Sequence, residues 1–414
     1  MSFRFLHLAD LHLETRFGGR PETRERLRQA TREAFARAVD YAIERRLHAV
    51  LVAGDLFDDS RLSTRTELFL VGQLRRLAEA GVWFLAVCGN HDPGGAGFRT
   101  ADLGVEGERV HFFRGGEPRV LQVTNREGVP VGVVVGAGHE SGQEAANLAA
   151  RFPLAPGPLP VVGLLHTSVE SAKSAADHPR YAPSTRSDYE RLPYSYWALG
   201  HIHLRQQAVA GLPVYYAGNL QGRHVGETGE KGGLVVEAFP GGSAEPRFVP
   251  FAPVRWERLP VRDFTAAASI DALAGDLARR IQALPRSAGE QLALRLELEG
   301  ETPLASELRS ELSLASLAEE VAMRSGALEL ELRAEKTSLP IDRARLRASP
   351  NVVAAALDLI ERASADDALL AALAPAALAH QAGEGEARLA YLRQLLEELP
   401  EELLLRGVER EVGA

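Results

Sequence analysis

Cysteine is almost absent from this 414-residue chain, which contains only Cys88. A single cysteine excludes an intramolecular disulfide and a zinc site built from cysteine ligands, and it favours a reducing compartment. The chain also lacks any apolar run near the ~18–20 residues that cross a bilayer. Its first residues, MSFRFLHLAD, lack the apolar core of a signal peptide. We therefore expect a cytoplasmic protein with no membrane attachment.

Lysine is scarce as well, occurring only at Lys173, Lys231 and Lys336, and the formal net charge is -9. Nucleic-acid-binding proteins usually carry a basic footprint, so the total charge argues mildly against a nucleic-acid ligand. Most of the net negative charge, however, lies at one end of the chain. Residues 350–414 carry a net charge of -7, which leaves about -2 for residues 1–349. The charge objection is therefore weak for the larger part of the chain.

The first hundred residues alternate between apolar strands and amphipathic helices. Residues 3–9, 48–55 and 82–92 are typical of buried strands, and residues 22–46 and 63–80 show apolar positions at helical spacing. This order predicts a parallel sheet with functional groups in the loops beyond its strand ends.

After residue 110 the pattern changes to shorter strands, which predict a second, mixed sheet packed on the first: VHFF, RVLQV, PVGVVVGA, PVVGLLH, YSYWALGH, PVYYAG and GGLVVEA. Residues 270–284 then predict a helix, and residues 292–299 and 327–333 alternate as half-exposed strands do. Because the length exceeds what one core normally fills, we expect three domains: residues 1–254, a small α+β domain at 255–345, and a helical segment at 346–414.

Five short segments place metal-competent side chains directly after predicted strands: DLH, GDLFDD, GNHD, LLHTS and GHIH. Each motif alone is more often a turn or a packed or surface histidine than a metal site. Together they supply carboxylate, amide and imidazole groups without cysteine, a set that suits Mn²⁺, Fe²⁺ or Zn²⁺. His201 and His203 are two apart, so they point to one face of a strand. The candidate ligands exceed the needs of one ion, and two metals bridged by a carboxylate suit attack on a phosphate.

The ordered motifs Asp-x-His, Gly-Asp, Gly-Asn-His-Asp, His and Gly-His-x-His resemble those of the calcineurin-like metallophosphoesterase superfamily. The segments FLHLADLHL, AGDLFD, CGNHD and YWALGHIH are similar to the SbcD family of DNA-repair nucleases. The segment YYAGNLQGRHVGETGEKG, with the chain length, is similar to its YhaO-like bacterial branch. The resemblance is strong over residues 3–240. It implies an α/β (α+β) fold: a four-layer αββα metallophosphoesterase sandwich with a small α+β capping domain and a helical C-terminal segment.

The resemblance also implies a role for each motif residue. One metal would be held by Asp10, His12 and His203, and the other by Asn90, His166 and His201, with Asp55 bridging the two. His91 would approach the scissile phosphate without binding metal, and Asp92 would orient His91.

The chain departs from archaeal and eukaryotic relatives at Asp58, where those proteins have a second active-site histidine. This leaves His91 as the only histidine that we expect to act in catalysis without binding a metal. Asp58 either solvates a loop or acts near the metals.

The glycine-rich segment QGRHVGETGEKG contains Arg223, His224 and Lys231. Such a loop can bind a DNA phosphate through backbone N–H groups and arginine, and it can equally be a structural turn.

The resemblance implies a Mn²⁺-dependent DNA nuclease, a 3′→5′ exonuclease with some endonuclease activity, with Fe²⁺ or Zn²⁺ as alternative metals. It would act in double-strand-break repair with an SMC-like ABC-type coiled-coil ATPase, which the C-terminal segment would contact. A homodimer through the nuclease-domain helices is a further expectation. Two alternatives remain: a metallophosphoesterase for small molecules or nucleotides, and a non-catalytic scaffold, against which the complete ligand set argues.

Overall fold

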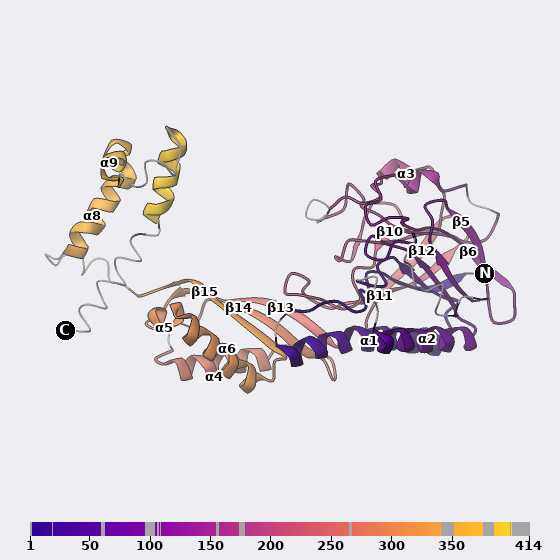
Figure 1. Cartoon of the computed structure of the whole chain (residues 1–414), viewed down its shortest axis with the longest axis horizontal. Helices are drawn as coiled ribbons and strands as arrows, with labels where there is room; N and C mark the ends of the chain where they lie inside the picture. The colour runs from indigo at the N-terminus through magenta and orange to yellow at the C-terminus, as the bar shows by residue number, and fades with distance from the viewer. Residues whose placement is uncertain are drawn as a thin grey trace. The chain divides into compact units, whose positions relative to one another are not determined.

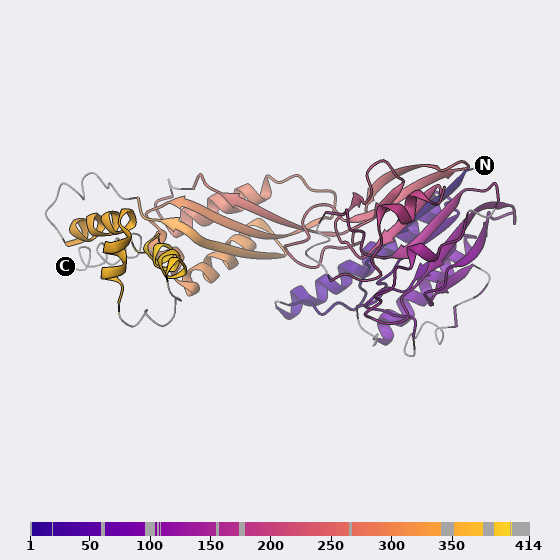
Figure 2. The same ribbon diagram turned by 90° about the horizontal axis from the view of Figure 1, so that it is seen from above.

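The computed structural model describes residues 2–18, 20–58, 63–95, 104–105, 107, 109–154, 157–173, 179–264, 267–340, 352–375, 385–397 and 399. The chain divides into two compact units (Figures 1 and 2). One comprises Met1–Glu257 and Pro285–Ala293, and the other Arg258–Leu284 and Leu294–Ala414. The expected domain limits at 254 and 345 stay a prediction.

The first unit contains a six-stranded sheet in the order β12-β11-β1-β2-β3-β4. Its strands are β1 (Phe3–Leu8), β2 (Ala49–Ala53), β3 (Trp83–Val87), β4 (Val110–Phe113), β11 (Gly232–Phe239) and β12 (Ser243–Pro250). Strands β1 to β4 run parallel, and β11 pairs antiparallel with β1. The parallel sheet that the first hundred residues predict is confirmed.

Both faces of this sheet are buried. Helices α1 (Pro21–Glu44) and α2 (Thr64–Glu79) cover one face, where Phe35 and Leu70 pack with Leu6 of β1. The alternate strand residues, Phe5 among them, enter a separate core against the second sheet. Burial on both faces explains why these strands are continuously apolar in sequence.

The second sheet has the order β5-β6-β7-β8-β10-β9. Its strands are β5 (Arg119–Thr124), β6 (Pro130–Ala137), β7 (Val161–His166), β8 (Tyr196–Gly200), β9 (Gln206–Gln207) and β10 (Val214–Tyr216). The four inner strands run parallel, whereas β5 and β9 pair antiparallel at the edges, so the sheet is mixed as expected.

The outer face of the second sheet carries its own core around Trp197 and Leu199. Among the described residues, this face is covered by the 3₁₀ helix η2 (Ala149–Arg151), by α3 (Arg186–Glu190) and by loops. The predicted α/β sandwich is therefore confirmed, with an outer layer on this side made of short elements.

Two predicted strands belong to the other sheet. VHFF forms β4 and GGLVVEA forms β11, and both lie in the first sheet rather than in the second. β4 continues the parallel pairing beside β3, and β11 returns across the sandwich to pair with β1. The assignment was wrong because strand composition does not specify the pairing partner.

Beyond the sandwich the chain forms a three-stranded sheet of order β13-β14-β15 with helices. The elements are β13 (Val254–Val261), α4 (Ile270–Gln282), β14 (Gln291–Glu301), α5 (Ala305–Arg309), α6 (Glu311–Ser325) and β15 (Glu329–Ser338). α4 packs with α6. The α+β character expected of this segment is confirmed.

The predicted C-terminal helical segment is described in part. α8 (Val352–Ala365) and α9 (Asp367–Leu373) contact one another, whereas residues 376–384 and 400–414 lie outside the described residues. No helix in the described part of the chain combines the length and the apolar character that a membrane span requires.

Candidate metal centre

The predicted ligands lie at the carboxyl ends of five parallel strands. Asp10 and His12 follow β1, Asp55 follows β2, and Asn90 follows β3. His166 ends β7 and lies opposite Gly200, the last residue of β8, which precedes the two remaining histidines, His201 and His203. Parallel strands end at the same edge of a sheet, so each sheet delivers its ligands to one place.

The glycines of these motifs permit a close approach between segments. A Cβ atom at Gly54 would overlap the ring of His166, and one at Gly89 would overlap the Asp55 carboxylate. Gly54 also has a φ of +87°, which a residue with a Cβ rarely adopts. The Gly-Asp and Gly-Asn-His sequences therefore serve packing around the ligands as well as turn formation.

Backbone strain gathers at the same place. Seven non-glycine residues in the described ranges have positive φ, and four of them are predicted ligands: Asp10 (50°), His12 (46°), Asp55 (50°) and His201 (103°). Such conformations cost free energy and are typical of functional sites, where the surrounding fold enforces them.

Asp10, His12 and His203 form one group whose potential ligand atoms all lie within 4.8 Å of one another. The Nδ1 of His12 lies 2.9 Å from Asp58 Oδ1, and the Nδ1 of His203 lies 2.6 Å from Glu227 Oε1. When each Nδ1–H donates to its carboxylate, both Nε2 atoms face the centre with lone pairs, 3.2 Å apart. Two nitrogens bound to one ion at ~2.1 Å are separated by about 2.9–3.4 Å, so this spacing fits a shared cation.

Asp10, Asp55 and His166 form a second group within the same distance limit. Asp55 Oδ2 lies 3.5 Å from His166 Nε2 of its own group and 3.7 Å from His12 Nε2 of the first group. Asn90 Oδ1 lies 3.0 Å from His166 Nε2. This position of Asp55 is compatible with the bridging role that the sequence suggests.

Two hydrogen-bond contacts help to position His201. Its backbone N–H donates to the Asp10 carboxylate at 3.1 Å, and its Nε2 lies 3.0 Å from the carbonyl oxygen of Pro179. In the expected ligand set, the Pro179 contact makes Nδ1 the nitrogen that would bind a metal.

The electrostatics of the two groups suit cations. Burial raises the pKa of Asp55 to about 6, and burial together with the neighbouring Asp55 raises the pKa of Asp10 well above its usual value. Burial lowers the pKa of His12 to about 3 and depresses the pKa of His166. Neutral imidazoles offer lone pairs, and buried carboxylates that repel one another gain from a cation between them. The two residue groups thus suggest two divalent metal ions, without selecting which metal.

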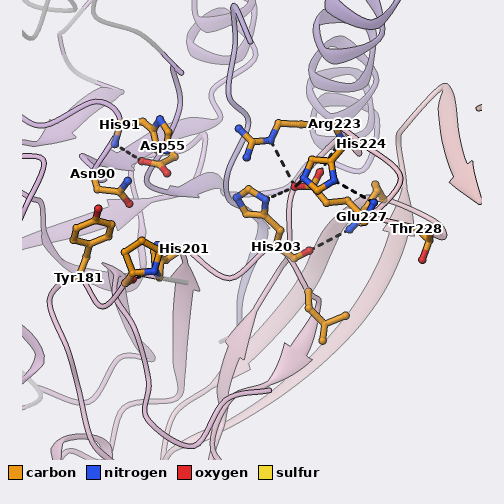
Figure 3. A pocket seen from close by; sticks show the side chains of 14 residues that line it. Asp55, Asn90, His91, Tyr181, His201, His203, Arg223, His224, Glu227 and Thr228 are labelled. Carbon is orange, nitrogen blue, oxygen red and sulfur yellow. Dashed lines mark hydrogen bonds and ion pairs between the residues drawn. The ribbon is translucent and has the colours of Figure 1, made fainter. Parts of the chain in front are cut away.

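His91 lies beside these groups with its side chain 40% exposed. Its backbone N–H donates to Asp55 Oδ1 at 3.0 Å, and its Nδ1 lies 3.2 Å from Asp58 Oδ1. Its exposure and its position next to Asp55 place its ring where a substrate can reach it (Figure 3).

Asp92 has different partners from those expected. It is buried, and its carboxylate accepts hydrogen bonds from the backbone N–H groups of Leu56, Phe57 and Gly89. These bonds fix the loops after β2 and β3 to one another. The carboxylate that contacts the His91 ring is Asp58. Orientation of His91 by Asp92 stays a prediction.

An open cleft of about 450 Å³ lies over the candidate ligands. Arg223, His224 and Lys231 all line it, together with Asp55 and His91 (Figure 3). The Lys231 ammonium donates to the carbonyl oxygen of His203 at 3.2 Å, which ties the glycine-rich loop to the metal centre. Phosphate binding by these three residues stays a prediction.

Sequence reasoning missed Glu227 altogether and left the role of Asp58 open. Burial opposes ionisation of both acids, yet the hydrogen bond from His12 and nearby cations lower the pKa of Asp58 to about 2. The hydrogen bond from His203 likewise holds the pKa of Glu227 below its usual value. The only sequence signal for Glu227 is an acid four residues after Arg223 in a glycine-rich loop.

Two family models match the chain: Calcineurin-like phosphoesterase over residues 3–205, and Metallophosphoesterase YhaO, middle domain, over residues 256–342. The chain is 33% identical over 304 residues to the uncharacterized metallophosphoesterase YhaO of Bacillus subtilis, with 72% of each chain covered.

More distant similarity links the chain to proteins named DNA double-strand break repair protein Mre11. Identity is 26% over 223 residues in Saccharolobus solfataricus, covering 51% of this chain and 54% of that protein. In Haloferax volcanii it is 39% over 89 residues, covering 22% and 19%. The chain thus spans about half or less of these Mre11 proteins.

Proposed function

This chain belongs to the calcineurin-like phosphoesterases and carries a YhaO-type middle domain, and on this premise we propose that it hydrolyses the phosphodiester bonds of DNA. Members of this family are metal-dependent phosphoesterases. The observation that carries the proposal is the position of His91, which is 40% exposed and lines an open cleft. It lies beside the two groups of candidate ligands, and it forms a third group of residues that could hold a metal with His12 and Asp58.

Two divalent cations, when bound, offset the charge of a phosphodiester and acidify a water molecule for attack. Asp55 and Asp10 would hold these ions in place from two strand ends. The Nδ1 of His91 is in contact with Asp58, so its Nε2 is the atom that would give a proton to the leaving 3′ oxygen. Asp92 supports this geometry by joining the loops that carry Asp55 and His91.

The choice of DNA as substrate rests on the distant similarity to proteins named for double-strand-break repair. We propose Mn²⁺ as the metal and 3′→5′ exonuclease activity with some endonuclease activity, in a cytoplasmic protein. An SMC-like ABC-type ATPase would be its partner, with α8 and α9 in the docking region, and the protein would form a homodimer.

A small-molecule or nucleotide phosphodiester is the second candidate substrate, and the cleft itself favours it. Its volume of about 450 Å³ lies within the ~300–1,000 Å³ usual for small-ligand sites. Glu227 also lines the cleft and offsets part of the positive charge of Arg223 and Lys231.

End-labelled duplex DNA tests the proposal. Purified protein is stripped with EDTA, supplied with Mn²⁺ or Mg²⁺, and compared with His91→Ala and with His111→Ala, which changes a histidine of β4 remote in sequence from the motifs. We expect Mn²⁺ to restore shortening from the 3′ end in the wild type and in the His111 control, and not in His91→Ala.

Intact DNA together with rapid hydrolysis of bis-p-nitrophenyl phosphate would overturn DNA as the substrate and favour the second candidate. Absence of turnover on either substrate with Mn²⁺ would contradict both candidates and leave the non-catalytic scaffold.

A further inference from the structure

In one candidate metal site, each of the two histidines has a carboxylate at its Nδ1, the ring nitrogen that faces away from the site. Asp58 contacts the Nδ1 of His12 at 2.9 Å, and Glu227 contacts the Nδ1 of His203 at 2.6 Å. Each acid thereby orients one ring and fixes its tautomer, the arrangement that commonly raises the affinity of metal-binding histidines. Both acids are at most 18% exposed, so water screens these contacts little.

Glu227 is held firmly in this position. Its second oxygen accepts from the Asn219 side chain and from the Arg223 backbone N–H, both at 2.7 Å. The Arg223 side chain joins the two acids, with Nη1 3.2 Å from Asp58 Oδ1 and Nε 3.6 Å from Glu227 Oε1. Figure 3 shows Arg223 and His203 meeting at Glu227.

The two acids differ in one respect. The same Oδ1 of Asp58 that contacts His12 also lies 3.2 Å from Nδ1 of His91, whereas Glu227 lies on the far side of His203 from that ring. Among the described interactions of Glu227, none involves His91. Asp58 thus contacts both a candidate metal ligand, His12, and the proposed proton donor, His91.

We propose that Asp58 and Glu227 are positioning residues with separable roles: Glu227 secures metal affinity through His203, whereas Asp58 secures metal affinity through His12 and also holds His91 for catalysis. The second role of Asp58 rests on the proposed phosphodiesterase function, and the metal-affinity roles do not.

Mn²⁺ alone is the probe for the first part. Isothermal titration calorimetry of the metal-stripped full chain compares wild type, Asp58→Asn, Glu227→Gln and the control Glu230→Gln, an exposed acid in the same loop. We expect each of the first two variants to weaken Mn²⁺ binding roughly 10–100-fold, as loss of a carboxylate behind a ligand histidine commonly does, and the control to bind as the wild type does. Wild-type affinity in either variant would overturn its role in metal binding.

Turnover of bis-p-nitrophenyl phosphate separates the two acids. At saturating Mn²⁺ we expect Glu230→Gln to keep the wild-type kcat and Asp58→Asn to be at least tenfold slower than Glu227→Gln, because only Asp58→Asn also deprives His91 of its partner. Full recovery in Asp58→Asn would overturn the second role. Asp58→Ser provides the same comparison if Asp58→Asn does not fold.

Imidazole nitrogen NMR spectra of ¹⁵N-histidine-labelled protein decide the second role independently of turnover. The His91 ring signals, assigned by comparison with His91→Ala, should shift in Asp58→Asn and stay in place in Glu227→Gln. If the wild type turns over no phosphodiester, the proposed function fails while calorimetry and these spectra still decide the positioning roles. Unchanged His91 signals in Asp58→Asn would refute the contact.

Discussion

At the scale of single residues, the candidate centre depends on which nitrogen of each histidine is already occupied. His166 Nδ1 lies 2.9 Å from the carbonyl oxygen of Ala53, and the Nδ1 atoms of His12 and His203 face carboxylates. All three rings therefore present Nε2 to the centre. The fold fixes the tautomers of these candidate ligands before any metal arrives.

His91 is the histidine that we expect to act in catalysis without binding a metal. Its Nδ1 contacts Asp58, and its side chain is 40% exposed. We expect His91→Ala to lose phosphodiester hydrolysis by at least 100-fold, the scale of general acid catalysis, and to retain two metals per chain. His203→Ala should lower the metal content. Elemental analysis after gel filtration in Mn²⁺ measures both. Metal loss in His91→Ala would make His91 a ligand, and unchanged metal content in His203→Ala would contradict the ligand assignment.

His7 should make the stability of the protein depend on pH. It is fully buried between Tyr196 and the carbonyl oxygen of Leu199, and burial lowers its pKa to about 3. Below a pH of about 6.5 the unfolded chain binds a proton that the folded chain refuses, so stability is lost as the pH falls from 6.5 towards 3. In this range His7 lowers the free energy of unfolding by up to ~1.4 kcal/mol for each pH unit of acidification.

Urea unfolding in EDTA at pH 7.5, 6 and 5 measures the effect of His7. We expect His7→Gln to show a shallower loss of stability on acidification than the wild type. Parallel pH dependence in the two proteins would contradict the assignment of a neutral, buried His7.

At the scale of elements, short loops after parallel strands carry the site, and glycine sets how closely those loops approach. Gly54 and Gly128 both have positive φ, at 87° and 80°. A Cβ atom at Gly54 would overlap the His166 ring, whereas a Cβ atom at Gly128 meets nothing within 4 Å. Alanine at Gly128 therefore tests backbone strain alone, whereas alanine at Gly54 adds a clash with a candidate metal ligand.

We expect Gly54→Ala to lower bound metal to one ion per chain or less, because His166 must move, and Gly128→Ala to retain two. Both variants should lose stability, by about 1 kcal/mol in the control, because alanine is strained at positive φ. Elemental analysis and urea unfolding measure the two effects. Equal metal content in both variants would show that His166 tolerates the added methyl group.

The sequence predicted the features that depend on local contacts. It missed the features that depend on contacts between residues far apart in the chain. The candidate ligands were recognised because each follows a strand within a few residues, and parallel strands bring their ends together. Glu227 was missed because its partner, His203, is 24 residues away, and nothing local marks the contact. The strands β4 and β11 were placed in the wrong sheet for a similar reason, since pairing with β3 and β1 is a long-range choice.

At the scale of the whole molecule, every candidate site residue belongs to the first of the two compact units. Metal that binds only the folded site stabilises it by ~2.7 kcal/mol at a concentration of 100 Kd. We expect Mn²⁺ to increase hydrogen-exchange protection in peptides from residues 2–257 and to leave peptides from 267–284 and 294–340 unchanged. Exchange with and without Mn²⁺, read by mass spectrometry, measures this. A comparable change in both sets of peptides would contradict a site confined to the first unit.

The chain leaves the first unit after Glu257 and returns to it for Pro285–Ala293. In that return segment the backbone N–H of Gln291 donates to the carbonyl oxygen of Pro253, and its side chain accepts from Arg26. A protein cut after residue 257 would therefore lack a piece of its own sandwich unit and leave Arg26 without this acceptor. Exchange of the whole second unit between relatives calls for three splice points rather than one, because the chain passes between the units three times.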